Sequence, residues 1–315
     1  MKDRIIIITG PTASGKSDIA LNLARSLETS IISSDSQQVY RFMDIGTNKT
    51  KDIWETDQYL LDVVDPNENF SVADFSKLAN KLIGEINNKG NIPIVAGGTG
   101  LYIDSLIFDM NYGRVKKDQA LRRKLEEEAK KFGNQYLHQQ LASIDKISAK
   151  KYHPNEVNRI IRALEIYQLT NKKPSEIRKG ENKLKENVDP MIFFLNYKDR
   201  DILYERINLR VVEMIKQGLV DEVRNLIKDF DLDENSQSMA AIGYKEVLTF
   251  LNDKISYDEM IDLIQKNTRH YAKRQVTWMK KYLNLPFSFE ITMDDLNKKD
   301  ASDIILTNIK EVYGL

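Results

Sequence analysis

The sequence contains a glycine-rich loop of the kind that binds phosphate groups. Residues 10–17 read Gly-Pro-Thr-Ala-Ser-Gly-Lys-Ser, which fits the pattern G-x-x-x-x-G-K-[ST]. Gly10 and Gly15 allow the backbone to curl, so that consecutive N–H groups can point at phosphate oxygens. Lys16 adds an ammonium group, and Ser17 offers a hydroxyl to Mg²⁺. The loop therefore predicts a site for a diphosphate or triphosphate group, without identifying the molecule that carries it.

An acidic residue and a second glycine-rich turn follow two further predicted strands. Asp35 comes directly after the strand predicted over 31–34, and the turn 97–102 follows the strand predicted over 92–96. In an open parallel sheet, ligands bind beyond the carboxyl ends of the strands, so we expect both segments beside the phosphate loop. A carboxylate there can ligate Mg²⁺ or accept a proton. It can equally cap the next turn, and its position alone leaves both roles open.

The elements that must position these residues follow a β-α alternation. The purely β-branched run 5–8 predicts a buried parallel strand, and the run 191–195 predicts a returning one. Apolar residues at helical spacing predict helices over 16–27 and 71–87, the second with Ser71 as its N-cap. Further helical patterns cover 199–217, 219–229 and 257–282. The fold class expected from this order is α/β, with a P-loop NTPase-like parallel sheet, flanking helices and an all-helical basic insertion domain.

Charge is distributed unevenly along the chain, although 47 Lys and Arg balance 47 Asp and Glu. Residues 114–189 carry 19 basic and 11 acidic side chains, a net charge of +8, whereas 1–113 carry −5 and 190–315 carry −3. We expect a core formed by 1–113 and 190–315, and a helical insertion over 114–189 in which 171–189 is a loop or mobile arm. The basic insertion is either a set of solvated helix faces or a surface for a polyanion.

The composition excludes several classes of site. The chain has no cysteine, which excludes disulfides and thiolate chemistry, and its three histidines show no spacing typical of a zinc site. No apolar run is long enough to span a membrane or to serve as a signal peptide, so we expect a cytoplasmic protein without a membrane partner. Hydrophobic residues make up 41% of the chain and charged residues 30%, which is typical of a globular protein with a hydrophobic core.

Nine stretches, in this order along the chain, resemble the tRNA dimethylallyltransferases, also called tRNA isopentenyltransferases. Besides the loop at 10–17, they are Asp-Ser-Gln-Gln-Val-Tyr (35–40), Met-Asp-Ile-Gly-Thr (43–47), Gly-Gly-Thr-Gly-Leu-Tyr (97–102), His-Pro-Asn (153–155), Asn-Arg-Ile-Ile-Arg-Ala-Leu-Glu (158–165), Leu-Tyr-Glu-Arg-Ile-Asn-Leu-Arg (203–210), Ala-Ile-Gly-Tyr-Lys-Glu (241–246) and Tyr-Ala-Lys-Arg-Gln-Val-Thr-Trp (271–278). The phosphate loop alone occurs in many families, but the whole set is specific.

The resemblance implies a reaction and its partners. The family transfers a dimethylallyl group from dimethylallyl diphosphate to N6 of the adenosine that lies 3′ to the anticodon of tRNA. The phosphate loop would then hold a prenyl diphosphate rather than ATP. The expected cofactor is Mg²⁺, the expected partners are the donor and the anticodon stem-loop of tRNA, and the expected state is a monomer.

The resemblance also assigns roles to individual residues. It implies a catalytic set in which Asp35 is the general base, together with Lys16, Thr99 and Arg210. The diphosphate would be bound by Gly10, Thr12, Ala13, Ser14, Gly15, Lys16, Ser17 and Arg210, and Mg²⁺ by Ser17. The tRNA would be contacted by Asp35, Ser36, Gln37, Gln38, Thr99, Arg122, Asn158, Arg159, Ile160, Ile161 and Arg162. Three of these are arginines of the basic insertion, so charge and resemblance both point to RNA there.

Three other functions use the same features. A small-molecule kinase would bind ATP at the loop and use the basic segment as a lid. An adenylate isopentenyltransferase would run the same chemistry on a free nucleotide, which needs no extended basic surface. A non-catalytic RNA-binding module would leave the phosphate loop unexplained.

The basic stretch 266–281 either contacts RNA or packs Tyr271 and Trp278 into the core.

Overall fold

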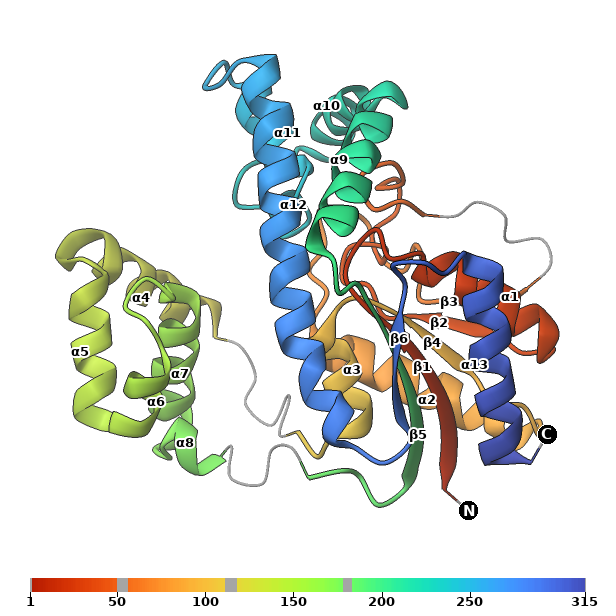
Figure 1. Cartoon of the computed structure of the whole chain (residues 1–315). Coiled ribbons are helices and arrows are strands. Elements are labelled where there is room, and N and C mark those ends of the chain that lie inside the picture. The colour runs from red at the N-terminus through yellow and green to blue at the C-terminus, as the bar shows by residue number, and fades with distance from the viewer. Residues whose placement is uncertain (1, 50–55, 111–117, 178–182, 315) are drawn as a thin grey trace. The chain divides into compact units, whose positions relative to one another are not determined.

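A computed structural model describes residues 2–49, 56–110, 118–177 and 183–314. Its centre is a six-stranded, all-parallel sheet in the order β3-β2-β4-β1-β5-β6 (Figure 1). The strands are β1 (Asp3–Thr9), β2 (Ile31–Ser33), β3 (Gln58–Tyr59), β4 (Ile94–Gly97), β5 (Val188–Asn196) and β6 (Ser288–Thr292). The predicted α/β class with a parallel sheet is confirmed. No helix among the described residues has the length and apolar character needed to cross a membrane.

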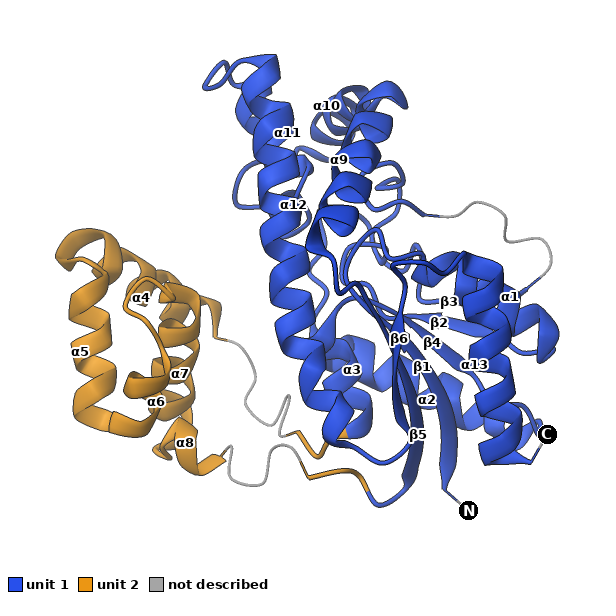
Figure 2. Ribbon diagram, viewed as in Figure 1, with its two compact units in different colours: residues 1–107, 186–315 blue, residues 108–185 orange. Residues whose placement is uncertain are grey.

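The chain divides into two compact units, which Figure 2 colours separately. Unit 1 comprises residues 1–107 and 186–315 and contains the whole sheet, and unit 2 comprises residues 108–185. The helices of unit 1 are α1 (Lys16–Ser26), α2 (Val72–Asn88), α3 (Gly100–Ile107), α9 (Arg200–Lys216), α10 (Leu219–Phe230), α11 (Tyr244–Leu251), α12 (Tyr257–Met279) and α13 (Lys298–Tyr313), with the short helices η1 (Ser238–Ala240) and η2 (Lys280–Asn284).

The core of unit 1 explains why the sheet is parallel and buried. Side chains alternate between its two faces, and Ile5, Ile6, Ile7 and Ile8 are all fully buried, because helices cover both faces. Ile6 and Ile8 belong to a cluster with apolar residues of α1, α9 and α13, while α2 packs against β1 and α3. Such a sheet leaves its carboxyl edge as the place where loops can bind a ligand.

The described part of unit 2 consists of helices, apart from an isolated antiparallel bridge between Phe108 and Leu184. Its helices are α4 (Gln119–Phe132), α5 (Asn134–Ile144), α6 (Lys146–Lys151), α7 (Val157–Thr170) and α8 (Pro174–Ile177). They enclose a small core of their own, to which Leu125, Leu137, Leu141 and Leu164 contribute. The unit begins at residue 108, six residues before the expected start of the insertion. It ends at residue 185, four residues before the expected end, since β5 already starts at Val188. Residues 114–117 and 178–182 of the expected insertion lie outside the described residues.

Several elements differ from the sequence expectations. The segment 171–189, expected to be a loop or mobile arm, contains α8 and the start of β5, so that expectation is wrong at both ends. Strands β3 and β6, and helices α3, α11 and α13, were not expected. Helix α13 could have been predicted from the sequence, because the apolar residues Ala301, Ile305 and Ile309 recur at four-residue spacing. All three are fully buried. Strand β3 has two residues and is too short for any periodicity.

Helix α2 starts at the predicted cap. Ser71 Oγ accepts a hydrogen bond from the backbone N–H of Asp74, and the Asp74 carboxylate accepts one from the Ser71 N–H. We expect Ser71→Ala to lower the free energy of unfolding by about 1 kcal/mol, because it leaves helix N–H groups without a partner. Urea unfolding followed by circular dichroism measures this. Ser26→Ala, at the exposed last residue of α1, is the control and should change stability by less than about 0.5 kcal/mol. Equal effects of the two substitutions would contradict the capping role.

Candidate active site

The phosphate loop joins the carboxyl end of β1 to the first turn of α1. Gly15 adopts a left-handed backbone conformation with φ of 87°, which turns the chain into the helix that begins at Lys16. A Cβ atom at Gly10 would lie only 2.5 Å from the carbonyl oxygen of Leu195 on β5, so this position requires glycine. The loop therefore lies against the sheet with the N-terminus of α1 behind it, which is the geometry that binds phosphate groups.

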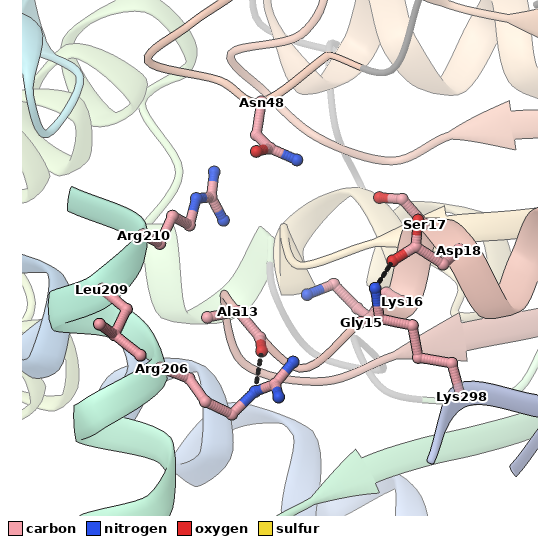
Figure 3. Close-up of a pocket in the computed structure, with 10 residues that line it drawn as sticks. All are labelled: Ala13, Gly15, Lys16, Ser17, Asp18, Asn48, Arg206, Leu209, Arg210 and Lys298. Atoms are coloured by element: carbon pink, nitrogen blue, oxygen red, sulfur yellow. Dashed lines mark hydrogen bonds and ion pairs between the residues drawn. The ribbon is translucent and has the colours of Figure 1, made fainter. Parts of the chain in front are cut away.

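A cavity of about 340 Å³ opens over this loop, and cations from three elements line it (Figure 3). Lys16 comes from the loop, Arg206 and Arg210 come from α9, and Lys298 comes from α13. Arg206 donates a hydrogen bond of 3.0 Å to the carbonyl oxygen of Ala13, and Lys298 forms an ion pair with Asp18. With four cations and one carboxylate, the cavity has the charge that a diphosphate group requires.

Lys16 forms no ion pair with any of the described residues. Its Nζ donates a hydrogen bond of 2.7 Å to the carbonyl oxygen of Pro11 in the same loop. Burial lowers the pKa of Lys16 to about 7, against the opposing effect of Asp35, and nearby Arg210 lowers it further. Burial also lowers the pKa of Arg210, whose Nη1 donates to Thr12 Oγ1 at 2.7 Å. Both cations would gain stability from a bound anion.

A second cavity, of about 330 Å³, lies on the other side of Arg210. One part of its lining is polar and includes Asp35, Ser36 and Gln37, the residues that follow β2. Another part is apolar and is formed by Val211, Met214, Ala241, Ile242, Ile264 and the ring of Tyr271. Arg210 lines both cavities, so its guanidinium lies next to a charged cavity on one hand and a partly apolar one on the other.

The loops after β2 and β4 are hydrogen-bonded to each other at the rim of this second cavity. Asp35 Oδ1 accepts from the backbone N–H of Gln37 at 2.9 Å, and Thr99 Oγ1 accepts from the N–H of Ser36 at 3.0 Å. Asp35 therefore caps its own turn and also lines the cavity. Gln38 is held within the fold, since its amide accepts from Ser33 and donates to the carbonyl oxygen of Thr47.

The structure thus brings most of the predicted residues of unit 1 together. The loop residues, Asp35, Ser36, Gln37, Thr99 and Arg210 gather at the carboxyl edge of β1, β2 and β4. Sequence reasoning missed Arg206 and Lys298, which line the phosphate cavity. It also missed Glu222 on α10, whose carboxylate accepts from the backbone N–H of Ile45 at 2.8 Å and from the Tyr244 hydroxyl at 2.7 Å. Glu222 thereby holds the loop that continues to Thr47, which lines the second cavity, and to Asn48, which lines the first.

In unit 2, Arg122 and Arg162 converge on the buried carboxylate of Glu165. Arg122 donates two hydrogen bonds of 2.9 Å to it, and Arg162 donates one of 2.5 Å. Burial by itself would raise the pKa of Glu165, but these bonds and the N–H of Asp118 outweigh it and lower the pKa to about 2. About a quarter of each arginine side chain remains exposed, so each holds the unit together and still presents charge to solvent.

The other predicted tRNA contacts of unit 2 separate into two groups. Asn158 and Arg159 are exposed on α7, and Arg159 pairs with Glu156 at 2.6 Å. The side chains of Ile160 and Ile161 are 0% and 2% exposed and pack in the core of the unit, and the expected tRNA contact of these two residues stays a prediction. On a helix, exposed and buried faces alternate within one turn, and these four successive residues cannot all face one ligand.

Two family models match the chain. The model described as IPP transferase matches residues 38–282, and the model described as Isopentenyl transferase matches residues 3–64. A tRNA dimethylallyltransferase of Thermoanaerobacter sp. (strain X514) is 47% identical over 285 residues, which is 90% of each chain. One of Acetivibrio thermocellus is 44% identical over 310 residues, which is 98% of this chain and 96% of the relative.

Two solved structures have the same fold. One is a tRNA delta(2)-isopentenylpyrophosphate transferase from Staphylococcus epidermidis, with 37% identity, a TM-score of 0.71 and coverage of 99% of this chain and 100% of the other. The second is a eukaryotic dimethylallyltransferase acting on tRNA, with 28% identity, a TM-score of 0.81 and coverage of 99% and 80%.

The lowered pKa of Lys16 makes anion binding pH-dependent. At pH 8 Lys16 is mostly neutral in the free protein, and a bound diphosphate favours its charged form. The wild-type protein should therefore take up about one proton more on binding diphosphate than the Lys16→Met variant does. Calorimetric titration with inorganic diphosphate, in two buffers of different ionisation enthalpy, measures this uptake. Equal proton uptake by the two proteins would contradict the role of Lys16.

The arginine cluster of unit 2 should stabilise the fold above acidic pH. We expect Glu165→Gln to cost about 3 kcal/mol of unfolding free energy at pH 7, because two arginines lose a buried carboxylate. Since the folded-state pKa is depressed to about 2, this difference should shrink as the pH falls from about 4.5 towards 2. Urea unfolding at several pH values measures it. Glu156→Gln, at an exposed pair, is the control and should cost less than about 1 kcal/mol. A Glu165→Gln protein as stable as this control would refute the assignment.

Proposed function

This chain belongs to the IPP transferase family of tRNA dimethylallyltransferases, and from that premise we propose how its residues share the reaction. It is a prenyltransferase that modifies tRNA, by adding a dimethylallyl group to N6 of the adenosine beside the anticodon. The assignment of residues rests on one observation above all: Arg210 lines both the cavity over the phosphate loop and the cavity that contains Asp35.

We propose that dimethylallyl diphosphate places its diphosphate over the loop and its dimethylallyl group beside Arg210. Lys16, Arg210 and the N–H groups of residues 13–17 would bind the phosphate oxygens. The apolar lining beside Arg210 suits the prenyl chain. As the C1–O bond breaks, negative charge grows on the leaving diphosphate, and fixed cations stabilise that charge most strongly.

Ser17 suits the expected Mg²⁺. Its hydroxyl lines the phosphate cavity at the start of α1. No cluster of three or more acidic or histidine side chains that could hold a metal occurs among the described residues. This donor set fits Mg²⁺, which prefers to keep several waters and to bind through few protein oxygens together with substrate phosphates. When bound, the ion would supply further positive charge to the diphosphate.

Asp35 takes the role of general base in this proposal. The adenine N6 amine attacks C1 of the donor, a C–N bond forms, the C1–O bond breaks, and one N6 proton passes to Asp35. An unassisted carboxylate cannot deprotonate this amine beforehand, so proton removal accompanies bond formation, when the nitrogen becomes cationic. Thr99 accepts from the Ser36 N–H and so fixes the turn that carries Asp35.

For the acceptor, we propose that the target adenosine leaves the stacked anticodon loop and enters the cavity beside Asp35. The side chains of Ser36 and Gln37 line that cavity, and Gln37 Oε1 is buried without a hydrogen-bond partner among the described residues. An amide there can bind the edge of adenine. Arg122, Arg159 and the exposed Asn158 of unit 2 would contact the RNA backbone. We also propose that the enzyme acts in the cytoplasm as a monomer, as the resemblance to the family implies.

An assay with three acceptors separates this function from its alternatives. The protein is incubated with Mg²⁺, dimethylallyl diphosphate and unmodified tRNA transcript, and the nucleosides are analysed by mass. We expect a dimethylallyl mass increase on the adenosine beside the anticodon. Transfer to free AMP but not to tRNA would indicate an adenylate isopentenyltransferase. Phosphorylation of a small acceptor by ATP, without transfer, would indicate a kinase.

Asp35→Ala should lower kcat by about 10² to 10⁴-fold, because the N6 proton loses its acceptor. Affinity for the diphosphate should change little, because Asp35 lies in the other cavity. Steady-state rates with tRNA and a direct binding titration measure the two quantities. Asp303→Asn, at an exposed carboxylate of α13, is the matched control and should retain full activity. A fully active Asp35→Ala enzyme would refute the assignment.

A further inference from the structure

The turn after β4 is packed so closely that a Cβ atom at any of its three glycines would force a neighbouring group to shift. A Cβ atom at Gly97 would lie 2.4 Å from the carbonyl oxygen of Ser34, which follows β2. A Cβ at Gly98 would lie 2.2 Å from Nε2 of Gln275, and one at Gly100 would lie 2.3 Å from Cδ1 of Trp278. The turn that carries Thr99 is therefore packed between the β2 loop on one side and α12 on the other.

Gln275 connects this turn to the phosphate loop. It lies on α12 and is 5% exposed. Its Oε1 accepts a hydrogen bond of 2.8 Å from the backbone N–H of Thr12, and its Nε2 donates one of 2.9 Å to the carbonyl oxygen of Gly98. One buried amide thus binds the loop after β1 and the loop after β4 with its two ends.

Each loop that Gln275 binds continues to a residue of the proposed reaction. Thr12 accepts from Arg210, the cation shared by the two cavities. Gly98 precedes Thr99, which accepts from the N–H of Ser36 beside Asp35. Resting on the function proposed above, we infer that Gln275 is a positioning residue, which sets the spacing between the diphosphate loop and the turn that holds the general base.

The chemistry of the site demands an amide at this position. One end must accept from an N–H and the other must donate to a carbonyl, and among side chains of this length only glutamine does both. Glutamate would accept from Thr12 but repel the Gly98 carbonyl oxygen, and methionine would do neither. A shift of about 1 Å between reacting groups can cost about 100-fold in rate, so a lost bridge should appear in kcat.

Gln275→Met tests the inference at nearly constant volume. We expect kcat with saturating tRNA and dimethylallyl diphosphate to fall about 100-fold. The dissociation constant for inorganic diphosphate should change little, because Lys16, Arg210 and the later loop amides remain in place. Gln265→Met, a partly exposed glutamine of the same helix, is the matched control and should keep the wild-type kcat. Thermal unfolding establishes that both variants are folded.

Gly98→Ala tests the same contact by changing the turn that Gln275 binds instead of Gln275 itself. The added methyl group displaces the Gln275 amide and should lower kcat to a similar extent. In a Gln275→Ala background the methyl group fits without a clash, since the next atom, the carbonyl oxygen of Gly10, lies at an ordinary van der Waals distance of 3.5 Å. The rate of the double variant should therefore equal that of Gln275→Ala alone. This non-additivity is not expected of two separate destabilising changes.

The outcomes separate this inference from the proposed function. If the wild type modifies tRNA and Gln275→Met retains the wild-type kcat, the positioning role is wrong and the function stands. If kcat falls only in proportion to a loss of folded protein, or if the two substitutions act additively, the bridge has a merely structural role. If the wild type transfers nothing to tRNA, the proposed function itself fails.

Discussion

The confinement of positive charge at one edge of a buried parallel sheet is the constraint on which the rest of this structure depends. Lys16, Arg206, Arg210 and Lys298 line one cavity, and Asp18 is the only carboxylate that the described residues contribute to its lining. Burial lowers the pKa of Lys16 and Arg210, so the charged form of each is disfavoured where no anion is bound. An anionic ligand offsets this effect, and this makes a diphosphate a natural occupant.

The surrounding fold holds the charged loop in place with buried polar side chains. Glu222 binds backbone N–H groups of the segment 44–46, and Gln275 binds the loops after β1 and β4. In unit 2, Glu165 holds Arg122 and Arg162 in the same manner. The carboxylates of Glu222 and Glu165 each accept several hydrogen bonds and both ends of the Gln275 amide are bonded, so these groups add rigidity to the segments that they bind. Preorganised loops of this kind can stabilise a developing charge without rearranging.

The sequence predicted those parts of the site that depend on local pattern. The phosphate loop, the strand 5–8 and the cap at Ser71 follow from residue types within a few positions of each other, and the structure has them where expected. Lys298, Glu222 and Gln275 act on segments more than 170 residues away, and no local pattern reveals such a contact. Ile160 and Ile161 show the converse, because a family motif names a stretch of helix whereas only one face of it can meet a ligand.

The central claim is that the diphosphate binds in one of the two cavities lined by Arg210 and the acceptor adenine binds in the other. A crystal structure with a non-reactive thiolo analogue of dimethylallyl diphosphate and an anticodon stem-loop tests it most directly. The account predicts the diphosphate against Lys16 and Arg210, with N6 of an unstacked adenine within hydrogen-bond distance of Asp35. A diphosphate bound away from residues 10–17, or an adenine whose N6 faces no part of the turn at Asp35, would contradict it.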